Sequence, residues 1–418
     1  MGREIPVGEC DMNDIFEKLP DALLPWYAGN KRQLPWRQDR EPYHIWLSEI
    51  MLQQTRVEAV KGYYSRFLSV LPDIAALAAA EDALLEKLWE GLGYYSRVRN
   101  LKKAAIEIMQ QHGGVFPRSY QLVRSLPGIG PYTAGAICSI AFGQPTPAVD
   151  GNVLRVVSRL TNDGTPIDTP AFKTSVEERL KRVYPSAAGE FTQALMELGA
   201  TVCGPNRKPD CGGCPCSAFC LGYRQGNAES LPVRLPRRQR RLEDKTVLIL
   251  SCGEKYALEK RPAKGLLAGL WQFPNLPGKL EAGEAIACLE QMGLQPKNVL
   301  RQLERTHIFT HIQWDMRGLY IELKDTSDIF AWFTAGQISE SAALPTAFRQ
   351  YECRISWRFR FLQVQYRAVF PDLRIRRRVF RAVQDHIHIR QMRKNCCSHC
   401  AELFACFPPK RTNVLFIL

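Results

Sequence analysis

The segment Leu126–Arg155, LPGIGPYTAGAICSIAFGQPTPAVDGNVLR, is the part of the sequence that decides the fold. It opens with a short turn around Gly128 and Gly130, and the residues that follow have a helical pattern. Such a turn presents backbone N–H groups at a helix N-terminus, an arrangement that binds phosphate without a charged side chain. Twenty residues after Gly130, Asp150 precedes a second predicted helix, Gly151–Leu160. The segment therefore predicts a phosphate-binding hairpin followed by a carboxylate at a helix start.

Two interpretations of this segment compete. In one, the glycines end one helix and Asp150 caps the next, with no role beyond folding. In the other, the turn and the carboxylate form one unit, which resembles the helix–hairpin–helix and aspartate of the DNA glycosylase superfamily. Either half alone is common, so it is the pair at this spacing that favours the second interpretation.

Length and charge set outer bounds on the protein. A chain of 418 residues can form two or three domains with separate cores. The net charge of +14 suggests a nucleic-acid partner. However, residues 353–418 hold 14 Lys and Arg against 3 Asp and Glu, which leaves a charge of +3 for the first 352 residues. DNA binding must therefore be argued from local features.

The sequence gives no sign of a membrane segment. No apolar run is long enough to span a bilayer, and the N-terminal residues lack the core of a signal peptide. We expect no membrane partner and a cytoplasmic, nucleoid-associated location. Fourteen cysteines without a secretion signal favour metal binding or simple burial over disulfides.

The chain divides into four segments. Residues 13–229 follow the apolar spacing of helices, and residues 230–243 form a connector rich in proline and arginine. Residues 244–351 show short alternating runs, and residues 352–418 are basic, contain cysteines and lack a periodic pattern. The strands are predicted at 246–251, 256–260, 307–314, 316–323 and 329–333. The predicted fold class is an all-α domain followed by a small α+β domain.

The predicted helix His44–Val60 carries a carboxyl group in an unusual place. Ile45, Glu49 and Leu52 share one face, so Glu49 lies on an apolar stripe. Burial raises a carboxyl pKa towards the range in which the group donates protons. With Asp150 it makes a pair suited to glycosidic bond cleavage, in which one group protonates the leaving group and an anion stabilises the cationic sugar. The alternative is a surface glutamate at a helix margin.

Four motifs narrow the resemblance. They are LPWR at 34–37, SEIMLQQT at 48–55, GLGYYSR at 91–97 and VDGNV at 149–153. In this order they resemble the adenine DNA glycosylase (MutY) family, which removes adenine mispaired with 8-oxoguanine. The similarity runs from about residue 13 to residue 351.

The resemblance implies roles for individual residues. Glu49 would protonate adenine and handle the water, Asp150 would stabilise the sugar cation, and Asn152 would support the site. Gln193 would read the flipped adenine, and Gln54 and Tyr94 would wedge into the opened base stack. Ordinary aromatic packing is the alternative for Tyr94. Further contacts with DNA are expected at Arg37, Gly128 and Gly130.

Tyr132 bears on the type of reaction. The related endonuclease-III-like lyases carry a lysine at the matching position, and its amine forms a Schiff base with the sugar. This sequence has no lysine between Lys103 and Lys173. We therefore place Tyr132 in the catalytic site of a monofunctional glycosylase that uses water. The alternatives are a bifunctional glycosylase/AP lyase and a catalytically silent lesion-binding protein.

Four cysteines form a compact set: Cys203, Cys211, Cys214 and Cys220. Thiolates at such spacing hold an iron–sulfur cluster or zinc, and the family resemblance implies a 4Fe–4S cluster. The chain departs from the family in its first gap, which has seven residues in place of six, and in an additional Cys216. We expect the cluster to be retained, because a loop absorbs one extra residue easily.

The second domain resembles the MutT-like C-terminal domain of the same family, which recognises 8-oxoguanine. The matching landmarks are GLWQFP at 269–274 and the run Phe309, Thr310 and His311. We predict that this run reads the lesion base. Packing in the core is an equal alternative for Phe309 and for His311.

The second domain also contains the start of a Nudix box. Gly278 and Glu284 fit its opening, but Met292 and Gly293 stand where an Arg-Glu pair is required. Without those carboxylates we expect no magnesium site. The domain is therefore predicted to recognise a base, and it is not predicted to hydrolyse a pyrophosphate.

The tail beyond residue 351 lies outside the family pattern and holds Cys396, Cys397, His399, Cys400 and Cys406 near its end. A nucleic-acid arm with a small zinc site and a poorly ordered extension both fit its composition, and the lack of periodicity favours the extension. The sequence as a whole predicts a monomeric, bacterial-type enzyme of base-excision repair. Its partner would be duplex DNA with adenine opposite 8-oxoguanine or guanine.

Overall fold

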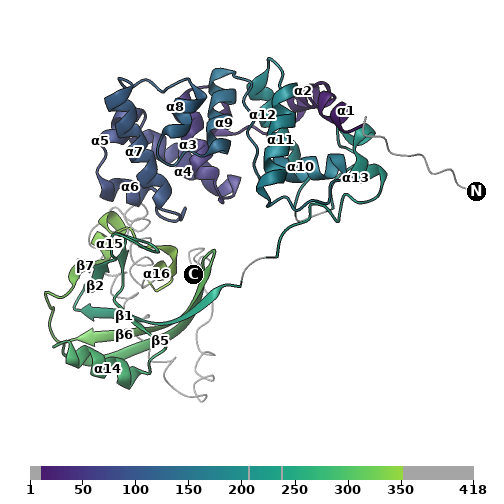
Figure 1. Cartoon of the computed structure of the whole chain (residues 1–418). Helices are drawn as coiled ribbons and strands as arrows, with labels where there is room; N and C mark the ends of the chain where they lie inside the picture. The colour runs from purple at the N-terminus through teal and green to yellow at the C-terminus, as the bar shows by residue number, and fades with distance from the viewer. Residues whose placement is uncertain (1–10, 206–207, 237–238, 352–418) are drawn as a thin grey trace, which may run out of the picture. The chain divides into compact units, whose positions relative to one another are not determined.

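A computed structural model describes residues 11–205, 208–236 and 239–351 (Figure 1). These residues belong to one compact unit, Met1–Tyr351. The basic tail and its cysteines lie outside the described residues, so both interpretations of the tail stay as predictions. Among the residues that the structure describes, no helix is long and apolar enough to cross a membrane.

The first part of the described chain consists of helices joined by short loops. The α-helices are α1 (Asp11–Glu17), α2 (Leu19–Asn30), α3 (Pro42–Leu52), α4 (Val57–Val70), α5 (Ile74–Ala79), α6 (Asp82–Leu88), α7 (Ser96–Gln111), α8 (Tyr120–Ser125), α9 (Pro131–Phe142), α10 (Gly151–Thr161), α11 (Pro170–Val183), α12 (Ala188–Thr201) and α13 (Leu221–Arg224). Two short 3₁₀ helices, η1 (Pro35–Arg37) and η2 (Ser217–Phe219), lie between them.

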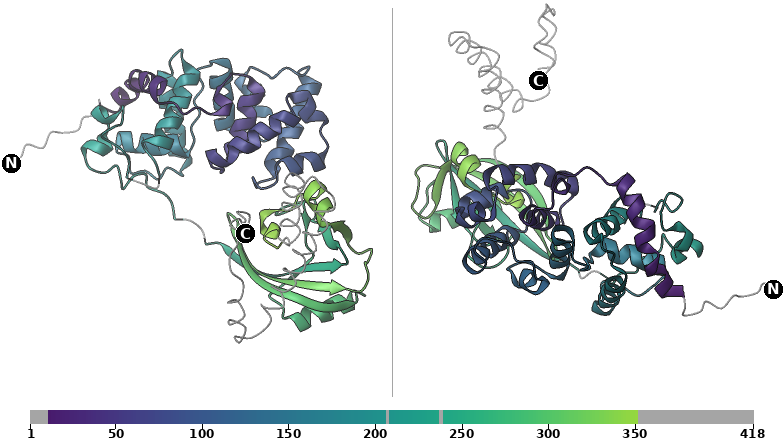
Figure 2. Two further views of the ribbon diagram at one scale, coloured as in Figure 1. Left: turned by 180° about the vertical axis from the view of Figure 1, so that it is seen from behind. Right: turned by 90° about the horizontal axis from the view of Figure 1, so that it is seen from above.

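The helices pack as two clusters, each around its own apolar core (Figures 1 and 2). Helices α3 to α9 surround the first core, where Trp46, Phe67 and Trp89 are almost completely buried. Helices α1, α2 and α10 to α13 surround the second, which contains Leu19 and Phe191. The chain thus passes from the second cluster to the first and back again, and the return passes through Asp150.

Helices α9 and α10 are placed by local signals at their ends. Pro131 occupies the first turn of α9, and Gly143, in the left-handed conformation with φ +66°, ends it. A Cβ on Gly135 would lie 2.0 Å from the carbonyl oxygen of Pro147. Glycine is therefore required where α9 meets the segment that leads into Asp150. This close approach fixes where α10 begins.

The second domain is a twisted sheet of seven strands, in the order β3-β2-β1-β6-β5, with β4 paired to β1 and β7 to β2. Its elements are β1 (Arg241–Cys252), β2 (Lys255–Lys260), β3 (Trp271–Gln272), β4 (Asn275–Pro277), α14 (Ala282–Gln291), β5 (Pro296–Ile308), β6 (Ile312–Leu323), β7 (Ala331–Thr334), α15 (Ala335–Ser341) and α16 (Thr346–Arg349). Strands β1 and β6 are parallel, with Val247 opposite Gly318, and β5 pairs antiparallel with β6. A core that includes Leu250, Leu289 and Ile321 lies between the sheet and α14 (Figure 1).

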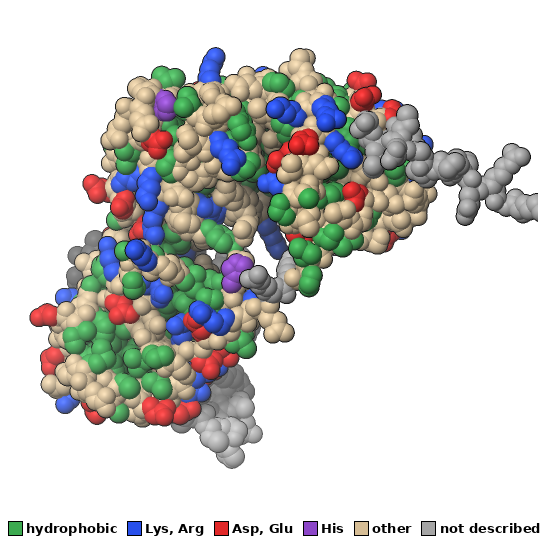
Figure 3. Space-filling model, viewed as in Figure 1, with side chains coloured by type: hydrophobic (Ala, Val, Ile, Leu, Met, Phe, Trp, Pro, Cys, Tyr) green, Lys and Arg blue, Asp and Glu red, His purple; other side chains and the backbone are tan. Residues whose placement is uncertain are grey.

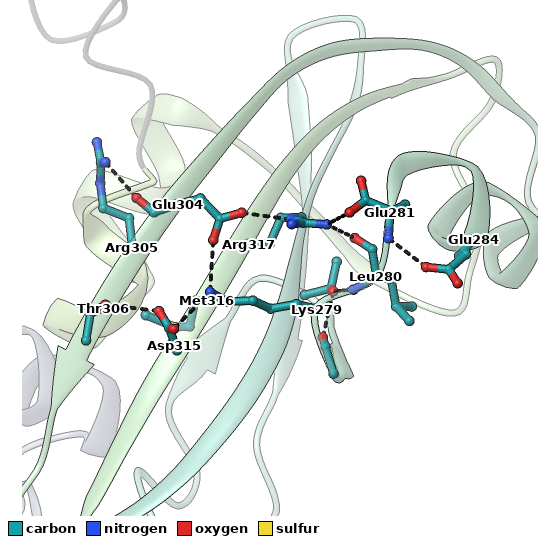
Figure 4. A network of polar contacts seen from close by, with 12 residues as sticks. Lys279, Leu280, Glu281, Glu284, Glu304, Arg305, Thr306, Asp315, Met316 and Arg317 are labelled. Atoms are coloured by element: carbon teal, nitrogen blue, oxygen red, sulfur yellow. Dashed lines mark hydrogen bonds and ion pairs between the residues drawn. The ribbon is translucent and has the colours of Figure 1, made fainter.

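Charged side chains of β5 and β6 form salt bridges with each other and with residues just before α14 (Figure 4). The Arg317 guanidinium donates to Glu304 Oε1 at 2.7 Å and to Glu281 Oε1 at 2.5 Å. Lys279 Nζ lies 2.9 Å from Asp315 Oδ2 and 3.2 Å from Glu304 Oε2. These partly exposed charges are thus matched in pairs on the surface.

Two predicted elements differ from the structure. The predicted helix His44–Val60 is broken, because α3 ends at Leu52 and α4 begins at Val57. The predicted strand 307–314 is instead the end of β5, a turn and the start of β6. Strand β5 was missed because it lies at the edge of the sheet, and its largely exposed side chains do not alternate between apolar and polar.

Candidate active site

A cavity of about 540 Å³ is lined by residues of both helix clusters. The structure brings together here seven residues that were named from the sequence: Arg37, Glu49, Gln54, Tyr132, Asp150, Asn152 and Gln193. A concave space of this size that contains convergent polar groups is the usual form of a small-ligand site. The hairpin glycines, the four cysteines and the Phe309–His311 run do not line it.

Glu49 is 6% exposed and lies near the end of α3. The pKa of Glu49 is raised to about 7. Burial is the main cause, the charge of Asp150 adds to it, and a hydrogen bond from Tyr132 opposes it. Tyr132 Oη donates to Glu49 Oε2 at 2.8 Å. Burial also raises the pKa of Tyr132 well above its ordinary value, so the phenol keeps its proton. Glu49 is therefore an acid poised near neutral pH.

Asp150 is the N-cap of α10 and accepts three hydrogen bonds. Its Oδ1 accepts from the backbone N–H groups of Asn152 at 2.9 Å and Val153 at 2.8 Å, and its Oδ2 accepts from Asn152 Nδ2 at 2.7 Å. Burial raises the pKa of Asp150 above its ordinary value, and these hydrogen bonds offset part of the rise. Donors of this kind favour the carboxylate over the acid. The two carboxyl groups therefore have different surroundings, one apolar and one rich in donors.

A buried ion-pair triad forms another wall of the cavity. The side chain of Glu197 is fully buried and accepts from Arg32 at 2.6 Å and from Arg37 at 2.8 Å. Burial raises the pKa of Glu197, but the hydrogen bonds from both arginines outweigh it and bring the pKa to about 2. Sequence reasoning missed Glu197 and Arg32. Their signals are the i,i+4 spacing of Glu197 from Gln193 on α12, and the position of Arg32 just before the LPWR motif.

Gln193 is held by two neighbours at the edge of the cavity. Its Oε1 accepts from Tyr27 Oη at 3.2 Å, and its Nε2 donates to the carbonyl of Gly189 at 3.3 Å. The Tyr27 ring in turn lies under the Arg37 guanidinium, 5.6 Å from the ring centroid. The amide is thus oriented before any ligand arrives.

Gln54 and Tyr94 lie on two loops that meet. Tyr94 Oη donates to Gln54 Oε1 at 2.5 Å and lies 2.9 Å from Thr310 Oγ1 of the second domain. Both residues have positive φ, +56° for Gln54 and +48° for Tyr94. This conformation costs about 1–2 kcal/mol for a residue with a side chain. Tyr94 is 46% exposed, so packing in the core is not its role.

The predicted hairpin connects α8 with α9. Gly128 has φ +80°, and a Cβ there would lie 2.7 Å from the Cβ of Asn100, so only glycine fits. Gly130 is the N-cap of α9 and faces open space. The turn therefore presents the start of a 12-residue helix.

Cys203, Cys211, Cys214 and Cys220 line a second cavity, under α10. Arg159 Nη1 donates to Cys203 Sγ at 3.2 Å, and Arg155 Nε donates to the Cys203 carbonyl at 2.9 Å. Cys216 is fully buried and does not line this cavity. Among the described residues, no three His, Cys, Asp or Glu side chains converge closely enough to hold one metal ion.

Arg155 also links this loop to the first cavity. Its Nη2 donates to Asn152 Oδ1 at 2.9 Å, and Asn152 donates to Asp150. Sequence reasoning missed Arg155, whose signal is its position one helical turn after Asn152.

Phe309, Thr310 and His311 form the turn between β5 and β6. Phe309 is half-buried, with its ring 4.6 Å from His307 and 4.8 Å from Trp314, centroid to centroid. Thr310 and His311 are exposed at the tip. On the face shown in Figure 3, basic and acidic side chains are interspersed, as expected for a body with little net charge.

The helical fold, the hairpin and the paired carboxyl groups define a base-excision DNA glycosylase with a second, Nudix-like domain. A family model described as the HhH-GPD superfamily of base excision DNA repair proteins matches residues 47–184, and a NUDIX domain model matches residues 246–351. The predicted fold class, a helix–hairpin–helix domain plus an α+β Nudix-like domain, is thereby confirmed.

Comparison with individual proteins specifies the family. The chain is 36% identical to the mouse (Mus musculus) adenine DNA glycosylase over 79% of this chain and 77% of that protein, and 34% identical to the human (Homo sapiens) one over 79% and 73%. A solved thermostable thymine-DNA glycosylase is 28% identical, with a TM-score of 0.47, over 51% of this chain and 98% of that one. The chain belongs to the adenine DNA glycosylase family. It is thus a base-excision repair enzyme whose partner is duplex DNA.

Proposed function

We propose that this enzyme hydrolyses the N-glycosidic bond of adenine mispaired with 8-oxoguanine or guanine, without a lysine Schiff base. The observation that carries the proposal is that Glu49, with its raised pKa, and donor-bound Asp150 line one cavity. No lysine is among the described residues that line this cavity, and Tyr132 binds Glu49 where a lyase would need an amine.

The residues of the cavity have different roles in the proposed reaction. The adenine flips out of the duplex into the cavity, where Gln193 is oriented to meet its edge. Glu49 donates its proton to the departing base, and the Asp150 carboxylate stabilises the positive charge that develops on the sugar. Glu49, now ionised, accepts a proton from the attacking water. Phe309, Thr310 and His311 at the β5–β6 turn read the opposite base.

The test is single-turnover cleavage of duplexes that contain A opposite 8-oxoguanine, A opposite G, or T opposite G. We expect cleavage of the first two and none of the third. Borohydride reduction during the reaction should trap no protein–DNA adduct. A trapped adduct would establish the bifunctional alternative, and binding without any cleavage would establish the silent one.

We further propose that Cys203, Cys211, Cys214 and Cys220 hold a 4Fe–4S cluster, which would cross-link the 203–220 loop. The four thiols line one cavity, and in a 4Fe–4S cluster each thiolate binds a different iron. A single zinc ion needs four sulfurs at about 2.3 Å from one centre. Cys203 lies beyond the seven-residue gap and lines the same cavity as the other three cysteines.

Iron analysis tests this assignment. Anaerobically purified protein should be brown, with about four irons per chain. Cys214→Ser should lose the iron, whereas Cys216→Ser is the matched control and should keep it. Colourless protein with stoichiometric zinc would contradict the cluster. We also propose that the protein is a monomer, which size-exclusion chromatography would check, and that it acts in the cytoplasm at the nucleoid.

A further inference from the structure

One buried arginine contacts both loops that carry Gln54 and Tyr94. Arg97 lies in the first turn of α7 and is 8% exposed. The two terminal nitrogens of its guanidinium carry four N–H groups and lie within hydrogen-bond distance of six acceptors, so some N–H groups are shared between two acceptors. Nη1 lies 2.8 Å from the Ile50 carbonyl, 3.1 Å from that of Met51 and 2.7 Å from that of Gln53, and Nη2 lies 3.0 Å from the Leu92 carbonyl, 3.0 Å from that of Gly93 and 3.4 Å from Thr55 Oγ1.

Two of these acceptors show what the arginine fixes. The Gln53 carbonyl belongs to the peptide group that leads into Gln54, and the Gly93 carbonyl belongs to the peptide group that leads into Tyr94. Gln54 and Tyr94 are two of the four residues other than glycine with positive φ in the described chain. A side chain persists in this region only where surrounding bonds over-determine the backbone. Arg97 provides such bonds to both peptide groups at once.

The same guanidinium also lies over the ring of Tyr94, which with Gln54 forms the pair of exposed side chains that we call the wedge. It lies 5.5 Å from the centroid of the Tyr94 ring and 5.3 Å from that of Trp89. The Tyr94 hydroxyl meets the Gln54 amide oxygen at 2.5 Å. The two exposed side chains are therefore held as one unit above a buried cation.

We propose that Arg97 is the positioning residue of this wedge. It sets the left-handed backbone at Gln54 and Tyr94 and thereby presents both side chains, already aligned, to the base stack that must open. This inference rests on the proposed function, because a protein that flips no base needs no wedge. Pre-alignment matters because a side chain that must first be ordered fills the vacated place in the stack less effectively.

The chemistry of the site explains why the residue is arginine. A planar guanidinium presents five donors in a fixed fork, whereas a lysine ammonium is a single point that cannot reach both loops. The Ile50 and Met51 carbonyls belong to the last turn of α3, whose partial negative charge also favours a cation. Arg97→Lys therefore keeps the charge and removes the bridge.

The test uses the full chain and the variants Arg97→Lys and Arg97→Gln, with Lys102→Gln as the matched control. Lys102 lies on the same helix and pairs with Asp82 on the surface. Base opening is measured by the fluorescence of 2-aminopurine placed beside the target adenine, with protein in excess. We expect both Arg97 variants to lose most of the fluorescence rise and at least tenfold in single-turnover excision. The control should stay within twofold on both measurements.

Two measurements separate positioning from simple stabilisation. The pH profile of excision, which Glu49 sets, should be unchanged in Arg97→Lys. In a Gln54→Ala/Tyr94→Ala background, Arg97→Lys should cost less than a further twofold, because nothing remains to be positioned. A normal fluorescence rise in Arg97→Lys, or its full loss repeated in that background, would overturn the proposal, as would failure of both Arg97 variants to fold.

Failure of the proposed function has a different signature. Wild-type protein that cuts no adenine mispair would defeat the proposed function. Wild-type protein that cuts normally, alongside an unaffected Arg97→Lys, would defeat only the role of Arg97.

Discussion

The carboxyl groups discussed above have different surroundings in the helical domain and in the Nudix-like domain. In the helical domain, Glu49 and Asp150 are buried or half-buried beside an open cavity. In the Nudix-like domain, Glu281 and Glu304 are matched with Arg317 at the surface. Glu284, which fits the Nudix box, completes the capping box of α14 by accepting a hydrogen bond from the Glu281 backbone N–H.

This difference separates chemistry from recognition. A carboxyl group acts as an acid or as a charge stabiliser when its surroundings shift its pKa and leave one side open to a ligand. A carboxyl group bound to surface cations is instead held as a carboxylate, as at Glu304, whose pKa the hydrogen bond from Arg317 lowers. This contrast supports the proposal that bond cleavage takes place in the helical domain.

The largest expected effect is that of Glu49→Gln. The amide keeps the shape of the side chain but has no proton to donate, so excision should fall by about 10²–10⁴-fold. Binding to the lesion duplex should stay within about tenfold, or about 1.4 kcal/mol. Glu284→Gln is the control in the other domain and should cleave normally. Near-normal excision by Glu49→Gln would remove this residue from the acid role.

A smaller effect is expected from removing the second domain by ending the chain within 230–243. Adenine excision should persist, but the preference for 8-oxoguanine over guanine opposite adenine should shrink by about 1–3 kcal/mol, the value of one good base contact. His311→Ala in the full chain should move in the same direction by a smaller step. If the shortened chain retains the whole preference, lesion reading resides in the helical domain.

The pH dependence of excision should report the pKa of Glu49. Protonated Glu49 is the active form and its pKa is about 7, so kcat/KM should fall above pH 7, by about tenfold per pH unit. Tyr132→Phe removes a hydrogen bond that lowers this pKa, so the fall should begin at higher pH. A profile that moves to lower pH, or not at all, would show that Tyr132 does not control Glu49.

The smallest effect is expected at the surface network of the Nudix-like domain. Lys279 is partly exposed and pairs with Asp315 and Glu304. Exposed pairs are screened by water and salt, so Lys279→Gln should lower the free energy of unfolding by less than about 1 kcal/mol. Excision should not change. A large loss of stability in thermal melts would show that this network is part of the domain's core.

The sequence predicted the parts of the molecule that depend on local patterns. The hairpin followed from Gly128 and Gly130, and the burial of Glu49 followed from its apolar stripe. The break at Gln54 did not follow, because the helical spacing continues through it and no glycine marks the left-handed residue. Its determinant is Arg97, more than 40 residues away along the chain. Contacts of that range leave no trace in a local pattern.

The arrangement of the site explains why Asp150 was predicted from the sequence and Glu197 was not. Asp150 carries its own signal, since a helix starts directly after it. Glu197 carries only the weak signal of its spacing from Gln193. A glutamate in a helix is usually exposed, and the partners that make its burial favourable, Arg32 and Arg37, lie about 160 residues earlier in the chain.

The cap at the start of α10 determines which site residue would be retained in a relative that has lost its activity. Asp150 satisfies the backbone of α10, so selection for a folded protein alone would retain it even after activity was lost. Glu49 gives the fold no comparable benefit, because a carboxyl group on an apolar stripe costs stability and a leucine there would relieve that cost. On the proposed mechanism, a glutamate at the position that aligns with Glu49 is therefore the better indicator of a working enzyme among the relatives of this chain. An aspartate at position 150 indicates only that the helix still needs its cap.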